Sequence, residues 1–332
     1  MSRKRKLRFV WIDDRPEREP MAENLGKTVN ASVMFIDVKG KDVGAVLESL
    51  LSTKEQPNLL IIDHVLDKTS GASMTRTGST MAEAVRAKWP QCPVIGVTAA
   101  RKRKNVNVLK ESRYDHLFQA ERIKDHVHCI RSTAEGFSQI VALLTPTIEA
   151  IIELIGVPDE DRPAFIRSLP DDLLTDLSDD SLATRLHAWM RDALFGRPGF
   201  LYDRLWAATI IGLNERGFRK VEGLFREARY DGVFDSPERE RWWRGRIKEI
   251  LYQLCPSDGK QLPWELGRKL DGITRSDLSR CYASGESLPE TVAYVDVHSS
   301  ERHAMRLRYT VPHPEYPALL YFEEVRVMGE GE

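Results

Sequence analysis

Three acidic side chains and one hydroxyl follow short apolar runs in the first third of the chain. Asp13 and Asp14 come directly after the run FVWI, Asp63 comes directly after LLII, and Thr98 comes directly after VIGV. If these runs are neighbouring parallel strands, the three carboxylates and the hydroxyl converge at one edge of a sheet. Like charges this close repel one another, so a hard divalent cation such as Mg²⁺ is the natural means of neutralising them.

The acidic residues belong to a regular alternation of apolar and amphipathic segments in residues 1–145. This alternation predicts five strands, at residues 7–12, 32–38, 58–62, 93–97 and 116–118, and five helices, at residues 17–25, 42–51, 79–88, 106–111 and 123–144. Several of the strands are apolar on both faces, which is typical of a parallel sheet covered by helices on both sides. We therefore predict an α/β domain with a five-stranded, doubly wound, flavodoxin-like sheet, whose site lies at the carboxyl ends of the strands.

The four polar residues and their positions resemble the receiver domain of response regulators in two-component phosphorelays, over most of residues 7–144. This resemblance implies that Asp13 and Asp14 hold Mg²⁺, together with Asp63 and the main-chain carbonyl of Val65. It also implies that Asp63 accepts a phosphoryl group from a histidine kinase and that Thr98 senses the phosphate. On this interpretation the protein is a signal-transduction regulator and a phosphoprotein.

Two departures from the receiver pattern leave a second interpretation open. The family has a lysine at the end of the fifth strand, where this chain has Gln119, although Lys124 or the basic run at residues 101–104 could reach inward. The switch aromatic becomes His116 or Phe118, and residues 66–77 form a longer segment than the short loop of the family. The alternative is a pseudo-receiver that is not phosphorylated and serves as a docking module in a multi-component assembly, for example a bacterial defence system.

The chain changes character at Thr145-Pro146, which predicts a receiver-like domain at residues 1–145 and a second domain at residues 146–332. Helical spacing of apolar residues predicts helices at residues 182–194, 201–229 and 238–254, and strands are expected at residues 291–297, 304–311 and 318–328. The second domain is therefore expected to be helix-rich α+β, and it resembles no output domain. The sequence identifies neither its function nor a cognate partner.

Three other functions are conceivable for the second domain: zinc binding, nucleic-acid binding and catalysis. Cys281, His298 and His303 have the residue types of a zinc site, but a fourth ligand would have to come from Cys255, His313 or an acid, so ordinary polar roles are favoured. The stretch at residues 239–248, RERWWRGRIK, has aromatic and basic residues suited to binding nucleic acid. The helical spacing of its apolar residues instead favours a helix face that packs into the core. An effector enzyme regulated by the receiver needs a catalytic group, and neither a GxxxxGK[ST] loop nor a GxSxG elbow is present.

The composition is that of a folded globular protein, with 42% hydrophobic and 30% charged residues among 332.

Charge is distributed unevenly along the chain. Residues 1–145 carry 24 Lys and Arg against 17 Asp and Glu, and residues 146–332 carry 25 Lys and Arg against 33 Asp and Glu. The two halves could therefore attract each other, or the basic half could meet an acidic partner. The four cysteines are widely scattered, and no apolar run is long enough to cross a bilayer. We therefore expect a cytoplasmic protein that acts through protein partners.

Overall fold

The computed structural model describes residues 6–52, 55–66, 78–99, 113–143, 145–256, 261–287, 290–296, 301–316 and 318–329. The chain divides into two compact units, each built from separate stretches of sequence. The first unit comprises Met1–Leu154, Asp171–Ala188 and Val233–Glu238. The second comprises Ile155–Pro170, Trp189–Gly232 and Arg239–Glu332.

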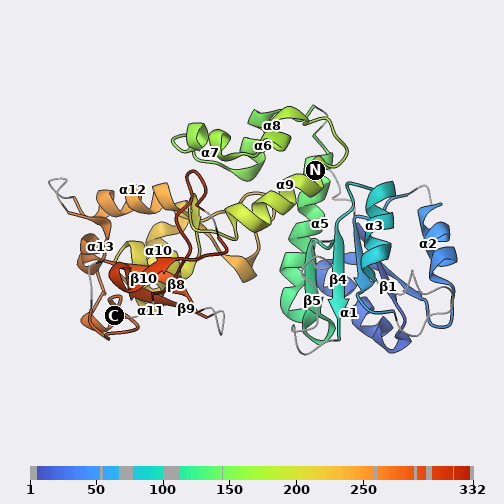
Figure 1. The fold of residues 1–332 in the computed structure, drawn as a ribbon, viewed down its shortest axis with the longest axis horizontal. Helices are drawn as coiled ribbons and strands as arrows, with labels where there is room; N and C mark the ends of the chain where they lie inside the picture. Colours follow the sequence, from blue (N-terminus) through green and yellow to red (C-terminus); the bar gives the residue numbers. More distant parts are fainter. Residues whose placement is uncertain are drawn as a thin grey trace. The chain divides into compact units, whose positions relative to one another are not determined.

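A five-stranded parallel sheet forms the centre of the first unit, with the strand order β2-β1-β3-β4-β5. Figure 1 labels three of these strands, β1, β4 and β5. Its strands are β1 (Leu7–Asp13), β2 (Ala31–Asp37), β3 (Leu59–Asp63), β4 (Val94–Thr98) and β5 (His116–Gln119). This is the strand order of the flavodoxin-like doubly wound fold. The predicted fold class and all five predicted strands are confirmed, with each boundary within one residue of the predicted one.

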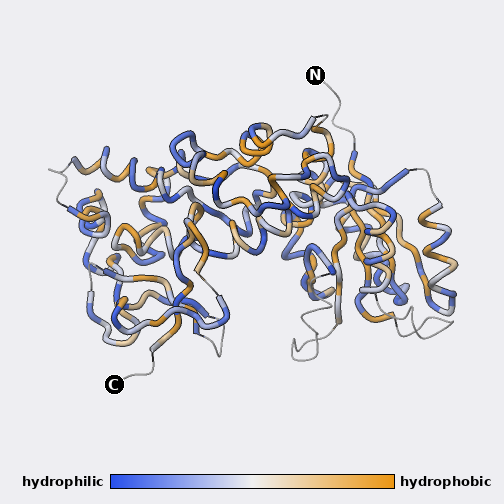
Figure 2. The backbone as a smooth tube through the Cα atoms, turned by 45° about the horizontal axis from the view of Figure 1, so that its top comes forward, coloured by the Kyte–Doolittle hydropathy of each residue, from blue (hydrophilic) through white to orange (hydrophobic). Residues whose placement is uncertain are grey.

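Helices cover both faces of this sheet, as the apolar character of its strands requires. One face packs Phe9, Trp11 and Ile61 against α1 (Glu19–Val29) and α5 (Val127–Val141). The other face packs Val10 and Ile62 against α2 (Val43–Leu51) and α3 (Gly78–Lys88). Hydrophobic segments run through the sheet in Figure 2. The predicted helix at residues 123–144 is a 3₁₀ segment at Ala120–His126 followed by α5, and the one at residues 106–111 lies outside the described residues.

Two segments from the second half of the sequence pack into the first unit. Residues 171–188 contain α8 (Asp171–Thr175) and most of α9 (Leu182–Trp189), and residues 233–238 form a short connection. The ring of Phe234 lies 5.9 Å from that of Phe137 on α5, and the carboxylate of Glu238 accepts hydrogen bonds from the main-chain amides of His128 and Cys129. The limits of this compact unit therefore do not coincide with the predicted boundary between residues 145 and 146.

The described residues of the second unit are rich in helices and form three two-stranded antiparallel pairs. Its helices are α7 (Arg162–Ser168), α10 (Arg204–Ile210), α11 (Glu215–Val221), α12 (Arg244–Leu254) and α13 (Pro263–Leu266). The helix α6 (Ile148–Ile155) belongs to the first unit except for Ile155, with which the second unit begins. Its strands are β6 (Leu201–Tyr202), β7 (Trp242–Trp243), β8 (Thr291–Val295), β9 (Arg302–Arg306), β10 (Thr310–Pro312) and β11 (Arg326–Met328). The prediction of a helix-rich second half with strands near its end is confirmed.

Two long helices predicted in this half are interrupted. Residues 201–229 form β6, α10, α11 and a 3₁₀ segment, because the side chains of Asp203 and Asn214 each cap a new helix and Gly212 has a φ of +77°. The predicted helix at residues 238–254 starts only at Arg244, because Trp242 and Trp243 pair with β6 instead. The predicted strand at residues 304–311 is likewise two strands, β9 and β10, separated by a 3₁₀ turn.

The core of the second unit contains Phe218, Ile247 and Leu251, together with Trp242. Trp242 and Trp243 are 1% and 3% exposed, so their rings are covered by protein and do not present a stacking surface for bases. The stretch at residues 239–248 therefore has a packing role, which is the interpretation that helical spacing favoured. Among the described residues, no helix is both long and apolar enough to span a bilayer.

Candidate metal centre

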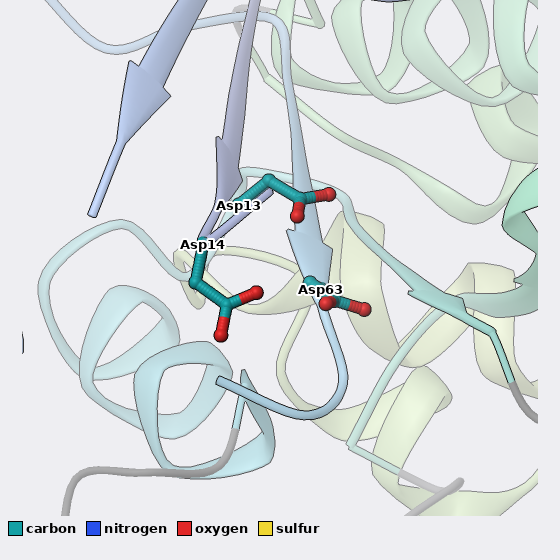
Figure 3. A group of neighbouring side chains, drawn as sticks. All are labelled: Asp13, Asp14 and Asp63. Atoms are coloured by element: carbon teal, nitrogen blue, oxygen red, sulfur yellow. The ribbon is translucent and has the colours of Figure 1, made fainter. Parts of the chain in front are cut away.

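The side chains of Asp13, Asp14 and Asp63 converge at the carboxyl ends of β1 and β3 (Figure 3). Carboxylate oxygens of the three residues lie within 4.8 Å of one another, and all three side chains are buried. The strands bring them together because β1 and β3 are hydrogen-bonded neighbours, in which Ile12 pairs with Ile62. The clustering predicted from sequence is therefore confirmed.

Asp13 is the most completely bonded of the three carboxylates. Its Oδ1 accepts a hydrogen bond of 2.9 Å from the main-chain amide of Arg15. Its Oδ2 accepts one of 3.1 Å from the indole of Trp11 and one of 2.8 Å from the guanidinium of Arg18. Both oxygens of Asp13 are therefore occupied by donors from the chain itself, which fixes the orientation of this side chain.

Arg18 is a member of the site that the sequence did not reveal. It lies at the end of the 3₁₀ turn Pro16–Arg18 that follows β1, it is 7% exposed, and its Nη1 lies 2.8 Å from Oδ2 of Asp13 and 3.3 Å from Oδ2 of Asp63. Burial opposes the charge of the guanidinium, but the hydrogen bond with Asp13 and the charges of Asp63 and Asp13 outweigh this and raise the pKa of Arg18. A permanent cation thus bridges two of the three acids.

Asp63 keeps an oxygen that accepts no hydrogen bond. Its side chain is 1% exposed, and its Oδ2 has no hydrogen-bond partner among the described residues although it lies close to Arg18. Burial and the negative charges of Asp13 and Asp14 raise the pKa of Asp63 to about 7, with Arg18 and Arg15 acting in the opposite direction. The carboxylate is therefore held in an environment that disfavours its charge.

The start of α3 fixes the main chain of Asp63. Gly78 donates its amide to the carbonyl of His64, and a Cβ at Gly78 would lie 2.1 Å from the carbonyl oxygen of Asp63. Only glycine permits this close approach, because any side chain would displace the strand end that carries the acid. The position of Asp63 is therefore set by both its strand and the following helix.

Thr98 and Gln119 lie side by side at the same edge of the sheet. Thr98 is the last residue of β4, is 7% exposed and is paired with Gln119, the last residue of β5. The prediction that a neutral amide occupies the end of the fifth strand is confirmed. Lys124 is exposed, and within the described part of the chain Arg18 is the basic residue that lies within 4.0 Å of Asp63.

The donor set suits a hard divalent cation. Magnesium prefers carboxylate oxygens and usually binds through one or two of them with water completing its shell. Asp14 and Asp63 would hold the ion directly, since both oxygens of Asp13 accept hydrogen bonds from the chain and Oδ2 of Asp63 accepts none. Val65 is 39% exposed and lies two residues beyond Asp63, and the role of its carbonyl stays a prediction.

Several predicted residues fall outside the described parts of the chain. These are the basic run at residues 101–104, most of the inserted segment at residues 66–77, and His298 of the zinc hypothesis. Among the described residues, Asp13, Asp14 and Asp63 are the group whose ligand atoms are close enough to hold a metal ion.

A second buried charge cluster links the sheet to α9. Asp115, just before β5, is 2% exposed, and its carboxylate contacts Arg86 of α3 at 2.8 Å, His187 of α9 at 3.2 Å and the amide of Val94 at 2.7 Å. Burial alone would raise the pKa of this carboxyl, but Arg86, His187 and the amide hold it well below its usual value. Arg86 also donates to the hydroxyl of Thr184, so α9 is tied both to the residue before β5 and to α3.

Comparisons with known proteins find similarity in structure only. No family model matches the chain, and no curated protein matches it in sequence. The response regulator TrrA of Thermotoga maritima, solved with Mg²⁺ and BeF, matches with 20% identity over 36% of this chain and 96% of its own, at a TM-score of 0.28. The receiver domain of the putative response regulator NarL from Mycobacterium tuberculosis matches with 19% identity over 40% of this chain and 97% of its own, at a TM-score of 0.29. The receiver domain of a putative LuxO repressor protein from Vibrio parahaemolyticus matches with 15% identity over 42% of this chain and 98% of its own, at a TM-score of 0.32.

Proposed function

We propose that this protein is a signal-transduction regulator whose first unit takes up a divalent cation and a phosphoryl group at Asp63. The observation that carries the proposal is the convergence of Asp13, Asp14 and Asp63 within 4.8 Å at the carboxyl ends of β1 and β3. This is the edge at which an open parallel sheet places its site. The strand order and the buried Oδ2 of Asp63, which accepts no hydrogen bond, support the same assignment.

The chemistry proposed for Asp63 is nucleophilic attack on phosphorus. An oxygen of Asp63 forms a bond to the phosphorus while the bond from phosphorus to the donor breaks, which yields an acyl phosphate. With a phosphohistidine donor the broken bond is P–N, and the leaving imidazole keeps its electron pair and takes up a proton from solvent. A bound Mg²⁺ would neutralise the charge on the transferring group, and Asp13 would keep Arg18 and Trp11 in place.

Arg18 provides the positive charge that Gln119 lacks. Its Nη1 lies 3.3 Å from Oδ2 of Asp63 while it remains hydrogen-bonded to Asp13 at 2.8 Å. A phosphoryl group on Asp63 would therefore form within reach of a guanidinium, which binds phosphate oxygens well. The hydroxyl of Thr98 would contact the same group from β4.

Control of the second unit is proposed to run through α9. His187 and Thr184 of this helix contact Asp115 and Arg86, and Asp115 immediately precedes β5, the strand that ends at Gln119. Beyond Ala188 the same stretch of chain continues into the second unit at Trp189. A rearrangement at the strand ends that moves β5 would thus act on a helix whose continuation belongs to the other unit.

A second candidate function is favoured by the same arginine. Because Arg18 already neutralises part of the acidic cluster, the site can persist without a metal ion, as a docking module in a multi-component assembly would require. In this case the first unit binds a protein partner, and neither Mg²⁺ nor a phosphodonor changes that binding.

The test is incubation of the purified protein with Mg²⁺ and acetyl phosphate, followed by intact-mass measurement. Wild type should gain a phosphoryl adduct, and Asp63→Asn should not. Asp37→Asn is the matched control, because Asp37 ends the neighbouring strand β2 opposite Asp13 and lies outside the cluster. If folded wild type gains no adduct with either acetyl phosphate or a phosphorylated histidine kinase, the docking function is the better account.

A further inference from the structure

A cavity of about 480 Å³ lies wholly within the second unit. Its walls come from the region between α9 and α10, from β8, and from the segments before α12 and after β10. This volume falls in the range of sites that hold small organic ligands. None of its lining residues belongs to the acidic centre of the first unit.

One wall of the cavity is apolar and well packed. The side chains of Leu201, Trp206, Ala293 and Val325 line it, and each is less than 10% exposed. Such a wall favours an apolar or aromatic body, since water contacting these side chains is released when a ligand covers them. A free inorganic ion would leave this wall unused.

Arg241 lines this cavity, and its guanidinium is held in a fixed orientation. Its Nη1 donates to the carbonyl of Glu240 at 3.0 Å, and its Nη2 donates to the carbonyl of Phe195 at 3.1 Å. Among the described residues, no carboxylate lies within the 4.0 Å of an ion pair with Arg241. Burial, with Arg302 and Arg239 nearby, lowers the pKa of this guanidinium, and Asp203 acts in the opposite direction.

Asp203, the lining acid whose charge acts on Arg241, already has two partners. Asp203 accepts a hydrogen bond of 3.0 Å from the amide of Trp206, which caps α10, and its other oxygen pairs with Arg302. The remaining acids of the lining are Asp296, whose main-chain amide binds the carbonyl of Glu301, and the exposed Glu315. The charge of Arg241 therefore has no counter-ion supplied at contact distance by its own wall.

A third arginine lies at an exposed part of the cavity. The guanidinium of Arg197 sits over the ring of Tyr316 at 5.0 Å from its centroid, and Tyr316 is 42% exposed. This pair offers a planar surface and a second positive charge on the side that solvent reaches. The lining thus combines a buried apolar wall, an inner cation without a contact counter-ion and an outer aromatic ring.

We propose that this cavity binds a small organic anion, with its carboxylate or phosphate ester on Arg241 and its apolar or aromatic body against Leu201, Trp206 and Ala293. A guanidinium donates in parallel to the two oxygens of such a group. The second unit is then a ligand-binding module, and this function does not depend on phosphorylation of Asp63.

The test uses a fluorescent anion with an aromatic body, 8-anilinonaphthalene-1-sulfonate, titrated into the full-length protein. Wild type should show saturable binding of one molecule, and Arg241→Gln should weaken it by at least about tenfold, because a hydrogen-bonded charge pair is lost. Arg219→Gln is the control, since Arg219 is exposed on α11 and outside the lining. The uncharged analogue N-phenyl-1-naphthylamine should bind wild type and Arg241→Gln equally.

A second pair of variants leaves Arg241 and its hydrogen bonds intact. Val295 is a half-buried lining residue of β8, so Val295→Glu places a carboxylate in the cavity, whereas Val295→Gln adds a neutral side chain of similar size. Val295→Glu should lose the fluorescent anion and Val295→Gln should keep it. Competition by phenyl phosphate, benzoate and inorganic phosphate distinguishes a phosphate ester, a carboxylate and a free phosphate ion as the bound group. The two aromatic anions are expected to compete best. Absence of saturable binding to wild type, or equal binding by the Val295 pair, would overturn the proposal.

Discussion

The Nη1 atom of Arg18 lies 3.3 Å from Oδ2 of Asp63, inside the acidic cluster and almost out of contact with water. A buried guanidinium in this position has two consequences. It stabilises a concentration of negative charge that would otherwise repel itself, and it would compete with a metal ion for Asp63. Both consequences are measurable.

Removing Arg18 should make the stability of the protein depend on divalent cations. Arg18→Ala leaves Asp13 and Asp63 buried without their counter-ion, so without metal the free energy of unfolding should fall by about 3 kcal/mol. Adding Mg²⁺ should restore more stability to this variant than to wild type. Thermal unfolding with chelator and with Mg²⁺ measures this, and Arg18→Lys, which keeps a charge, should show a smaller response. Equal responses of Arg18→Ala and wild type to Mg²⁺ would contradict the competition.

The raised pKa of Asp63 predicts a pH-dependent stability in the absence of metal. Its value of about 7 in the folded protein lies above the ordinary 3.8, so the folded protein binds more protons than the unfolded chain between these values. The free energy of unfolding should therefore fall as pH rises through this window. Asp63→Asn removes the effect and should be more stable than wild type at pH 8 by on the order of 3 kcal/mol.

The advantage of Asp63→Asn should shrink as pH falls towards 5, where wild type is already protonated at Asp63. Chemical unfolding at both pH values with chelator present gives the two differences, and Asp37→Asn serves as the control. An Asp63→Asn effect of the same size at both pH values would show that the carboxyl does not titrate in this window.

Asp115 should anchor α9 to the sheet. Asp115→Ala leaves Arg86 and His187 without their shared carboxylate in a buried setting, and the protein should lose about 3 kcal/mol of stability. Hydrogen exchange should quicken in α9 and at the start of β5 before it does in β1. Asp125→Ala, which removes an exposed pair with Arg122, should change stability by less than about 1 kcal/mol. Unchanged exchange in α9 would refute the anchoring role.

Glu238 should stabilise α5 from a distant part of the sequence. Its two carboxylate oxygens accept the amides of His128 and Cys129 at 3.0 and 3.1 Å, in the first turn of the helix. Glu238→Ala should cost about 1 kcal/mol, as the loss of a helix cap usually does. Unfolding by denaturant measures this, and Glu227→Ala, at an exposed position of the second unit, is the control. Equal losses in the two variants would argue against capping.

A lysine at Gln119 should speed phosphoryl transfer if Asp63 is the acceptor. Gln119 ends β5 beside Thr98, so Gln119→Lys adds an ammonium group at the edge that carries the acids. Adduct formation from acetyl phosphate should quicken by about tenfold, measured by a time course of intact mass. Lys124→Gln should leave the rate unchanged, because Lys124 is exposed and Arg18 is the cation beside Asp63. A rate unaffected by Gln119→Lys would mean that Arg18 already saturates the requirement for charge.

The sequence alone determined the sheet and the meeting of its acids. Continuous apolar runs such as LLII report a strand buried on both faces, and the residue after each run then lies at a known edge. Asp13, Asp14 and Asp63 are close because that edge is shared by hydrogen-bonded neighbours. Gln119 was also correctly placed, since it ends an apolar run in the same way.

The tertiary structure alone decided which groups complete that edge and where the helices end. Arg18 reaches Asp63 only because of the turn at Pro16–Arg18, and a position five residues beyond Asp13 carries no periodic signal. Helical spacing at residues 201–229 indicated one apolar face but not that Asp203 and Asn214 would cap separate helices. The packing of residues 171–188 into the first unit likewise rests on long-range contacts of His187 with Asp115 and Phe234. Local patterns specify which face of a helix or strand is buried, whereas the segment that packs against that face depends on the free energy of the whole fold.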